Sequence, residues 1–222
     1  MRVTKDRDVR KSELIEAAET LFREEGYRQT TVSHIVKKVG VAQGTFYYYF
    51  QSKDDILDAV VDHYIDIYRE ALERLLVRED IDPCRKIEIV ANTALAMHKY
   101  DPRLAEFLHT EENLATHQRY MMKSISEVIP LITAIVGQGK EAGIFNLRYP
   151  RESVEMLVYA FMYLEDAVAL SEDDERYRHM IQAAEDILTR VLGVESGRLR
   201  LDPSGAGNVL QLIHSHDAKP EA

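Results

Sequence analysis

Apolar side chains recur every three or four residues along most of the chain, which places them on one face of an α-helix. The pattern predicts an all-α protein, and capping residues and glycines mark where the helices begin and end. One long segment contains Pro130, so we expect its helix to be broken or kinked there. The expected helices are residues 9–25, 32–39, 43–50, 53–78, 83–100, 102–109, 110–143, 151–170 and 172–192.

Two short apolar segments flank Gly40. The first repeats valine and isoleucine at helical spacing, and Thr30 and Thr31 before it are N-cap candidates. Gly40 follows, where the end of a helix tolerates a left-handed backbone. The second segment, residues 43–50, begins two residues later. Two helices joined by a tight turn with glycine predict a helix-turn-helix, whose second helix is sized for the major groove of DNA.

The second segment reads QGTFYYYF, and its side chains suit a DNA-contacting helix. Phe46 and Phe50 are four residues apart and are expected to pack inward as anchors. The other positions supply four hydroxyl groups for phosphate oxygens and base edges. These hydroxyls belong to Thr45, Tyr47, Tyr48 and Tyr49.

The next helix begins almost at once. Ser52 and Asp55 have the spacing of a capping box, with Ser52 as N-cap. Lys53 then lies on the first turn, where free backbone N–H groups already favour an anion such as a phosphate. The sequence therefore predicts a phosphate contact at Lys53.

Charge is unevenly distributed along the chain. The formal net charge is −10, but residues 1–53 hold ten Lys and Arg against seven Asp and Glu, a net charge of +3. The remaining residues hold 18 basic against 31 acidic side chains, a net charge of −13. The first eight residues also form a basic arm that includes Arg7, and such arms can follow a phosphate backbone. DNA attracts the basic part and repels the acidic part, which orients the encounter.

The ordered string GVAQGTFYYYFQSK closely resembles the signature of tetracycline-repressor-like (TetR family) transcription regulators, and the likeness extends from Val9 to Lys53. It implies a DNA-binding domain at residues 1–52 and a helical effector-binding and dimerisation domain at residues 53–193. Ser33 is shorter than the residue that many members carry there, so the third helix is expected to bear more of the base recognition. The implied DNA-binding residues are Thr31, Ser33, Gln43, Gly44, Thr45, Tyr47, Tyr48, Tyr49 and Lys53.

The last two helices point to a homodimer. The segment LVYAFMYLEDAVAL is apolar almost all round, and no later helix in the chain remains to cover its outer side. A second copy of the chain is the expected cover, and a two-fold dimer matches a palindromic operator. The interface candidates are Tyr159, Met162, Tyr163, Ile187 and Val191.

The resemblance also implies a pocket for a small-molecule effector. Its candidate residues combine aromatic rings, sulfur and imidazole, which suits a mainly apolar ligand with a polar group. Relief of repression by the ligand is the commoner mode in the family, and we adopt a ligand-released repressor as the hypothesis, although the sequence does not separate repressor from activator. The pocket candidates are Tyr68, His98, Phe107, Tyr120, Met121 and Phe161.

Other classes of protein fit the sequence less well. A helical metalloenzyme needs two Glu-x-x-His motifs on facing helices, and the chain has no such pair, so no metal or cofactor is expected. A purely protein-binding helical adaptor would need neither the basic start nor the hydroxyl-rich helix. No stretch of about 20 apolar residues suggests a membrane span, and the polar start lacks an apolar signal region, so a cytoplasmic protein is expected.

Residues 194–222 form a C-terminal extension of different composition. RLRLD and VLQLIHSH flank the turn-rich stretch PSGAGN, which fits a β-hairpin, a strap on the helical domain or a flexible tail. His214 and His216 are a weak metal pair, because two ligands without further convergence are poor evidence.

Overall fold

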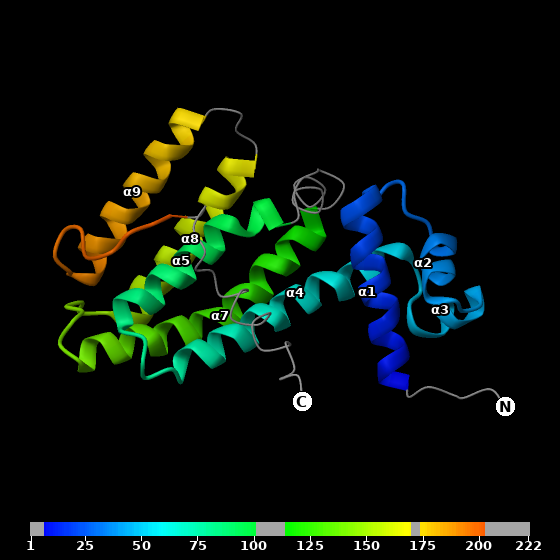
Figure 1. The fold of residues 1–222 in the computed structure, drawn as a ribbon, viewed down its shortest axis with the longest axis horizontal. Coiled ribbons are helices and arrows are strands. Elements are labelled where there is room, and N and C mark those ends of the chain that lie inside the picture. Colours follow the sequence, from blue (N-terminus) through cyan, green and yellow to red (C-terminus); the bar gives the residue numbers. More distant parts are fainter. Residues whose placement is uncertain (1–6, 101–113, 170–173, 203–222) are drawn as a thin grey trace, which may run out of the picture. The chain divides into compact units, whose positions relative to one another are not determined.

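The computed structural model describes residues 7–100, 114–169 and 174–202, although side chains are not described at 96–100, 114–115, 165–169 and 174. This part of the chain is helical and contains no strand, which confirms the all-α fold (Figure 1). The helix expected at 102–109 lies outside the described residues. The helices are α1 Arg7–Glu25, α2 Val32–Val39, α3 Gln43–Tyr49, α4 Lys53–Leu76, α5 Pro83–Tyr100, α7 Leu114–Glu141, α8 Pro150–Ala169 and α9 Asp174–Leu192.

The chain divides into two compact units. The first comprises residues 1–64 with 101–120, and the second comprises residues 65–100 with 121–222. The division falls inside α4 and inside α7, so each of these helices contributes to both units. The domain boundary expected after residue 52 stays a prediction.

The first unit has a small core where α1 to α4 meet. Helix α1 buries one apolar face, made of its leucines, alanines and phenylalanine, as the helical periodicity predicts. Ile35 and Val36 of α2 and Phe46 of α3 join them, and α4 adds residues of its first two turns. Burial of this apolar surface is the main force that holds such short helices in place. The buried residues are Leu14, Ala17, Ala18, Leu21, Phe22, Ile35, Val36, Phe46, Phe50, Ile56, Leu57 and Val60.

The second unit has a larger core built by α5, α7, α8, α9 and the later part of α4. A lysine lies inside it: Lys86 is only 3% exposed. Its Nζ donates to the backbone oxygen of Leu76 at 2.9 Å and to Gln138 Oε1 at 2.8 Å. Gln138 Nε2 donates to the same Leu76 oxygen at 3.0 Å. Burial lowers the pKa of Lys86. The Leu76 carbonyl, at the end of α4, thus accepts one hydrogen bond from Lys86 and one from Gln138.

Helix ends follow the sequence signals closely. Gly40 and Gly143 both have positive φ, at 74° and 69°, and end α2 and α7 as expected. At Gly40 the backbone N–H groups of Gly40 and Val41 bond the oxygens of Lys37 and Val36, which closes the last turn. By contrast, α7 continues through Pro130, so the helix is not broken there, and the alternative of a kink stays a prediction. Val128, Ile129 and Ile132 are buried around the proline, and this packing outweighs the lost hydrogen bond.

The start of the C-terminal extension lies on the second unit as a strap, residues 198–202. Leu199 is fully buried and Leu201 is 8% exposed. The backbone N–H of Arg200 donates to Glu88 Oε1 at 2.8 Å, and that of Asp202 donates to Asn92 Oδ1 at 2.7 Å. The N–H of Leu201 donates to a carboxylate of α9, Glu185 Oε2, at 2.9 Å. Of the three alternatives, these residues therefore form a strap; residues 203–222, with His214 and His216, lie outside the described part.

Within the described residues, one segment of α7, Thr116–Glu141, is long and apolar enough to cross a membrane by length and composition. One such helix is weak evidence for a membrane protein, because core helices of soluble proteins meet the same two criteria.

Candidate nucleic-acid interface

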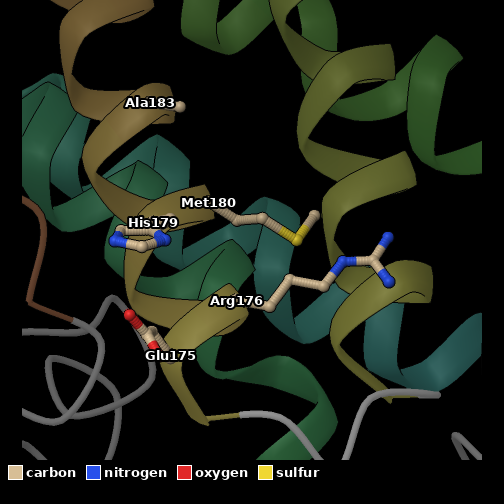
Figure 2. Close-up of a pocket in the computed structure, with 5 residues that line it drawn as sticks. All are labelled: Glu175, Arg176, His179, Met180 and Ala183. Atoms are coloured by element: carbon tan, nitrogen blue, oxygen red, sulfur yellow. The ribbon is translucent and has the colours of Figure 1, made fainter.

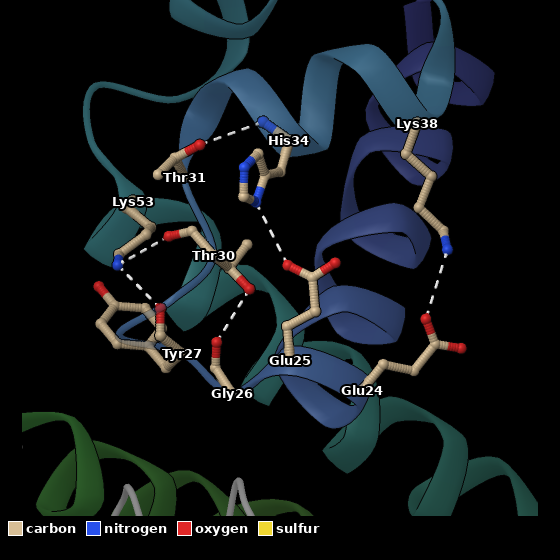
Figure 3. Close-up of polar contacts among 9 residues, drawn as sticks. All are labelled: Glu24, Glu25, Gly26, Tyr27, Thr30, Thr31, His34, Lys38 and Lys53. Atoms are coloured by element: carbon tan, nitrogen blue, oxygen red, sulfur yellow. Dashed lines mark hydrogen bonds and ion pairs between the residues drawn. The ribbon is translucent and has the colours of Figure 1, made fainter.

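The start of α2 is fixed by Thr31, one of the two capping candidates. Its Oγ1 accepts a hydrogen bond from the backbone N–H of His34 at 3.2 Å, as an N-cap does. Thr30 is instead fully buried, and its hydroxyl donates to the oxygen of Gly26 at 2.9 Å (Figure 3). Thr31 therefore accepts a hydrogen bond from a free N–H group in the first turn of α2, while Thr30 closes the loop that precedes this helix.

Two contacts connect α2 to the end of α1. His34 Nδ1 lies 3.2 Å from Glu25 Oε2, and Lys38 Nζ lies 3.8 Å from Glu24 Oε2 (Figure 3). His34 stands at the third helical position, where a side chain can reach back toward the preceding helix. The imidazole of His34 therefore has its partner on α1 and not within α2.

Helix α3 is held by its two phenylalanines. Phe46 is fully buried and Phe50 is 3% exposed, which confirms that they anchor the helix. Because these residues point inward, Tyr47 and Tyr48 on the remaining surface are 54% and 63% exposed. None of the predicted DNA-binding residues of α2 and α3 is buried. The exposed ones are Thr31, Ser33, Gln43, Gly44, Tyr47 and Tyr48, and the partly buried ones are Thr45 and Tyr49.

Lys53 is more than a surface charge. Its Nζ donates to the oxygens of Tyr27 at 2.9 Å and Thr30 at 3.0 Å, and it lies 4.0 Å from the centre of the Tyr27 ring (Figure 3). Partial burial lowers its pKa. The ammonium therefore ties the loop between α1 and α2 to the first turn of α4. Two of its three N–H groups are used, and one remains for an external acceptor.

Tyr27 completes this anchor. Its hydroxyl donates to the carboxylate of Asp54, next to Lys53 on α4. Burial, together with this bond, raises the pKa of Tyr27 above its ordinary value, so the phenol stays protonated as a donor. Sequence reasoning missed the Tyr27–Asp54 and Lys53 contacts. The only signal was a tyrosine directly after Gly26 and a lysine at the start of the next helix.

The start of α4 confirms the capping box with one change. Ser52 Oγ accepts from the N–H of Asp55 at 3.1 Å, as expected. The carboxylate of Asp55 accepts from the N–H of Gln51 at 2.8 Å, one residue before the N-cap. Both ends of this reciprocal pair are satisfied, so α4 begins rigidly where α3 has just ended.

Two cations of α1 lie over aromatic rings at α3. The Arg7 guanidinium carbon is 5.3 Å from the centre of the Tyr48 ring, and Lys11 Nζ is 5.9 Å from that of Phe50. The start of α1 thus borders the exposed surface of α3 within the first unit. The sequence placed Arg7 in a basic arm but gave no sign of its aromatic partner.

Comparison with known proteins decides the family. A family model described as "Bacterial regulatory proteins, tetR family" matches residues 14–60, and one described as "Tetracyclin repressor-like, C-terminal domain" matches residues 101–187. The chain belongs to the TetR family. It is a DNA-binding transcription regulator with a helix-turn-helix in α2 and α3, as the sequence signature indicated.

Individual relatives agree with this assignment. The TetR-family chain is 29% identical over 139 residues to the fatty acid metabolism regulator protein of Bacillus subtilis, which covers 59% of this chain and 68% of the relative. It is 26% identical over 170 residues to the transcriptional repressor KstR2 of Rhodococcus jostii, covering 73% and 78%. Among solved structures, FadR of Bacillus subtilis in complex with stearoyl-CoA has the same fold, with a TM-score of 0.57, 23% identity and coverage of 83% and 99%.

Within the first unit of this TetR-family chain, α7 contacts α4 through one carboxylate. Asp58 of α4 accepts hydrogen bonds from Arg119 and, at 3.3 Å, from Thr116 of α7. Asp58 lies one helical turn after Asp54, which accepts the hydrogen bond from the Tyr27 hydroxyl. The first half of α4 is therefore bonded on one side to the loop before α2 and on another to α7.

The predicted effector residues are not gathered at one described cavity. Tyr68 and Phe161 pack, partly buried, against the core of the second unit. Tyr120, in the first unit, stacks with His117, whose ring centre is 6.5 Å away, and Met121 is partly buried. Phe107 and the side chain of His98 lie outside the described residues. The effector pocket of this TetR-family protein stays a prediction.

A cavity of about 470 Å³ lies elsewhere, on the first half of α9. Its walls mix charged and apolar side chains, and none of them was predicted from the sequence. Arg176 and Met180 extend toward the neighbouring helix, whereas Glu175 and His179 point to the other side (Figure 2). Its lining residues are Glu175, Arg176, His179, Met180 and Ala183. The cavity is an open surface depression, so it does not enclose a ligand in the way an effector pocket would.

The predicted dimer residues differ in how far they are exposed in the single chain. Tyr159, Tyr163 and Ile187 are 45%, 68% and 50% exposed, although each is a large apolar or aromatic side chain. Val191 is partly buried. Met162 is only 7% exposed in the single chain, because it packs within its own protomer, so it has little surface left for a partner.

Proposed function

We propose that this TetR-family protein is a repressor that binds a palindromic DNA operator as a homodimer and is released by a small, mainly apolar effector. The observation that carries the DNA-binding part is the geometry of α3. Two buried phenylalanines fix the helix, Tyr47 and Tyr48 are exposed, and Thr45 and Tyr49 are partly exposed. A helix of this length, presented on one side of a small unit, fits the major groove.

The DNA contacts divide into two kinds. Gln43, Gly44, Thr45 and Tyr47, toward the start of α3, are assigned to base edges and the adjacent backbone. The other side chains bind phosphates, which position the protein without reading sequence. The assigned phosphate contacts are Thr31, Ser33, Tyr48, Tyr49 and the remaining N–H of Lys53.

The dimer is proposed through α8 and α9. Four exposed apolar or aromatic side chains, Met156, Tyr159, Tyr163 and Ile187, lie on these two helices of the second unit. Exposed apolar side chains gathered on neighbouring elements are typical of protein interfaces. A two-fold pairing of this surface brings two α3 helices to one operator, and Met162 supports the surface from within its own chain.

The effector class is supported by the relatives. The structure of the FadR relative contains stearoyl-CoA, an acyl chain with a polar head. We assign the effector of this chain to the same broad class, a mainly apolar molecule with a polar group, held by residues among Tyr68, His98, Phe107, Tyr120, Met121 and Phe161. Release follows from linkage: the effector lowers DNA affinity only if it binds the DNA-incompetent state more tightly.

The test is a fluorescence-anisotropy titration of the purified protein against DNA from around its own gene, at two salt concentrations. Tight, salt-sensitive binding to a palindrome with two chains per site supports the proposal. Thr45→Ala and Tyr47→Ala should each weaken binding to that site while circular dichroism and dimerisation stay unchanged. If neither the neighbouring DNA nor a site selected from random DNA binds more tightly than random sequence, the repressor proposal fails and a protein-binding adaptor becomes the better description.

A further inference from the structure

We propose that Arg7 extends the DNA interface onto α1 by positioning the Tyr48 ring and by contacting the same stretch of phosphate backbone. The proposal rests on the DNA-binding function above and assigns a role to a residue outside the helix-turn-helix. Arg7 and Tyr48 are 41 positions apart in the sequence, and the structure places them together.

The Tyr48 ring has two neighbours, a cation and a second aromatic ring. The Arg7 guanidinium carbon is 5.3 Å from the centre of the Tyr48 ring. Tyr49 meets the same ring edge-on, at 4.9 Å between ring centres and 89° between planes. Tyr48 is nonetheless 63% exposed, so much of its side chain faces solvent. Contact with a cation and with an aromatic edge restricts the rotamers of a side chain that would otherwise move freely on the surface.

Lys11 places this contact on a continuous strip of α1. It lies four residues after Arg7 and therefore on the same face of the helix. Its Nζ is 5.9 Å from the centre of the Phe50 ring, directly after the end of α3. One face of α1 thus presents two cations along α3.

The charge of Arg7 is available to DNA, whereas the charge of Arg10 is already paired with a carboxylate. Arg10 Nη1 bonds Glu13 Oε2 at 2.6 Å, which neutralises it locally. Among the described residues, Arg7 has no carboxylate within ion-pair distance. A guanidinium over an aromatic ring keeps the N–H groups at its edge free, and that edge matches the oxygens of a phosphate. The Tyr48 hydroxyl and the Arg7 edge are therefore adjacent donors on one exposed surface.

The experiment measures operator affinity of the full chain against salt concentration. Arg7→Ala should lower affinity and reduce the magnitude of the salt slope by about 1.8 for a dimer, which is two phosphate contacts. The affinity ratio of wild type to variant should then shrink by about 12-fold between 50 and 200 mM salt. Arg10→Ala, which removes the same charge from the same helix, is the matched control and should leave the slope unchanged.

A second set of variants separates positioning from charge alone. Arg7→Lys should restore most of the salt slope. In a Tyr48→Ala background the loss caused by Arg7→Ala should be smaller than in wild type, because the ring that holds the guanidinium is gone. Additive losses would refute the positioning role, and an unchanged slope in Arg7→Ala would refute the phosphate contact. In both cases wild type still binds its operator; failure of the proposed function would instead abolish specific binding by wild type.

Discussion

Replacement of Lys53 by methionine tests whether this residue holds the helix-turn-helix together. Methionine keeps most of the length and apolar stem of lysine but removes the ammonium. The oxygens of Tyr27 and Thr30 then lose a donor at 2.9 and 3.0 Å, and the Tyr27 ring loses the cation over its face. Since Thr30 directly precedes the N-cap of α2, the loss acts on the loop that positions both DNA-reading helices.

The expected cost follows from the contacts. Hydrogen bonds to charged groups contribute about 1.5–3 kcal/mol each, so the two bonds give an upper figure of about 3–6 kcal/mol. Lys53 is only partly buried, and water can reach part of the freed carbonyl surface. Removal of the ammonium also relieves the desolvation that lowers its pKa. We therefore expect a loss of about 2 kcal/mol in the free energy of unfolding.

The assay is thermal unfolding followed by circular dichroism at one protein concentration, because the midpoint of a dimer depends on concentration. A loss of about 2 kcal/mol lowers the midpoint by about 4–8 °C for a chain of this size. Lys37→Met is the matched control, because Lys37 is an exposed lysine on α2 and its replacement should change stability by less than about 0.5 kcal/mol. Operator titrations on the same variants report the phosphate role separately, as a salt slope reduced by about one ion for each protomer.

The two roles can fail independently. Equal midpoints for Lys53→Met and Lys37→Met would refute the anchoring role, whatever the DNA data show. A salt slope equal to that of wild type would refute the phosphate contact and leave the anchor intact. A loss of affinity on one sequence only would contradict the phosphate contact, since a phosphate contact does not read bases.

Three further predictions concern the second unit. Gly139→Ala should lower the free energy of unfolding by about 1–3 kcal/mol, because a Cβ there would stand 2.1 Å from the buried Phe145 ring. Gly137→Ala, on the same helix but with open space around it, should raise the free energy of unfolding by up to about 1 kcal/mol. Urea unfolding of both variants measures these changes, and equal effects would contradict the packing at Gly139. Asn92→Ala removes the acceptor of the Asp202 N–H and should speed amide hydrogen exchange or proteolysis at the end of the strap. An unchanged exchange or cleavage rate would show that the strap is held without Asn92. Ile187→Glu should shift the protein toward monomer in analytical ultracentrifugation with its helical content retained; an intact dimer would remove this residue from the proposed interface.

The sequence alone determined the parts that depend on neighbours along the chain. The helical periodicity, the cap at Thr31, the left-handed Gly40 and the box at Ser52 all act over three to five residues, and they placed the helix-turn-helix correctly. The sequence also predicted that Phe46 packs inward, because its position in α3 places it on the buried face of that helix. The periodicity could not decide whether Pro130 interrupts α7, since the core packing that keeps the helix continuous comes from other helices.

Only the tertiary structure decided which distant side chains meet. Lys53 bonds backbone oxygens 26 and 23 residues away, and Lys86 bonds Gln138, 52 residues away. Arg7 lies over Tyr48, and the N–H of Asp202 bonds Asn92, 110 residues away. A lysine or arginine in sequence looks the same whether it faces solvent, a carbonyl or a ring. Its partner is set by how the helices pack, because long-range contacts carry no local periodicity that a sequence pattern could reveal.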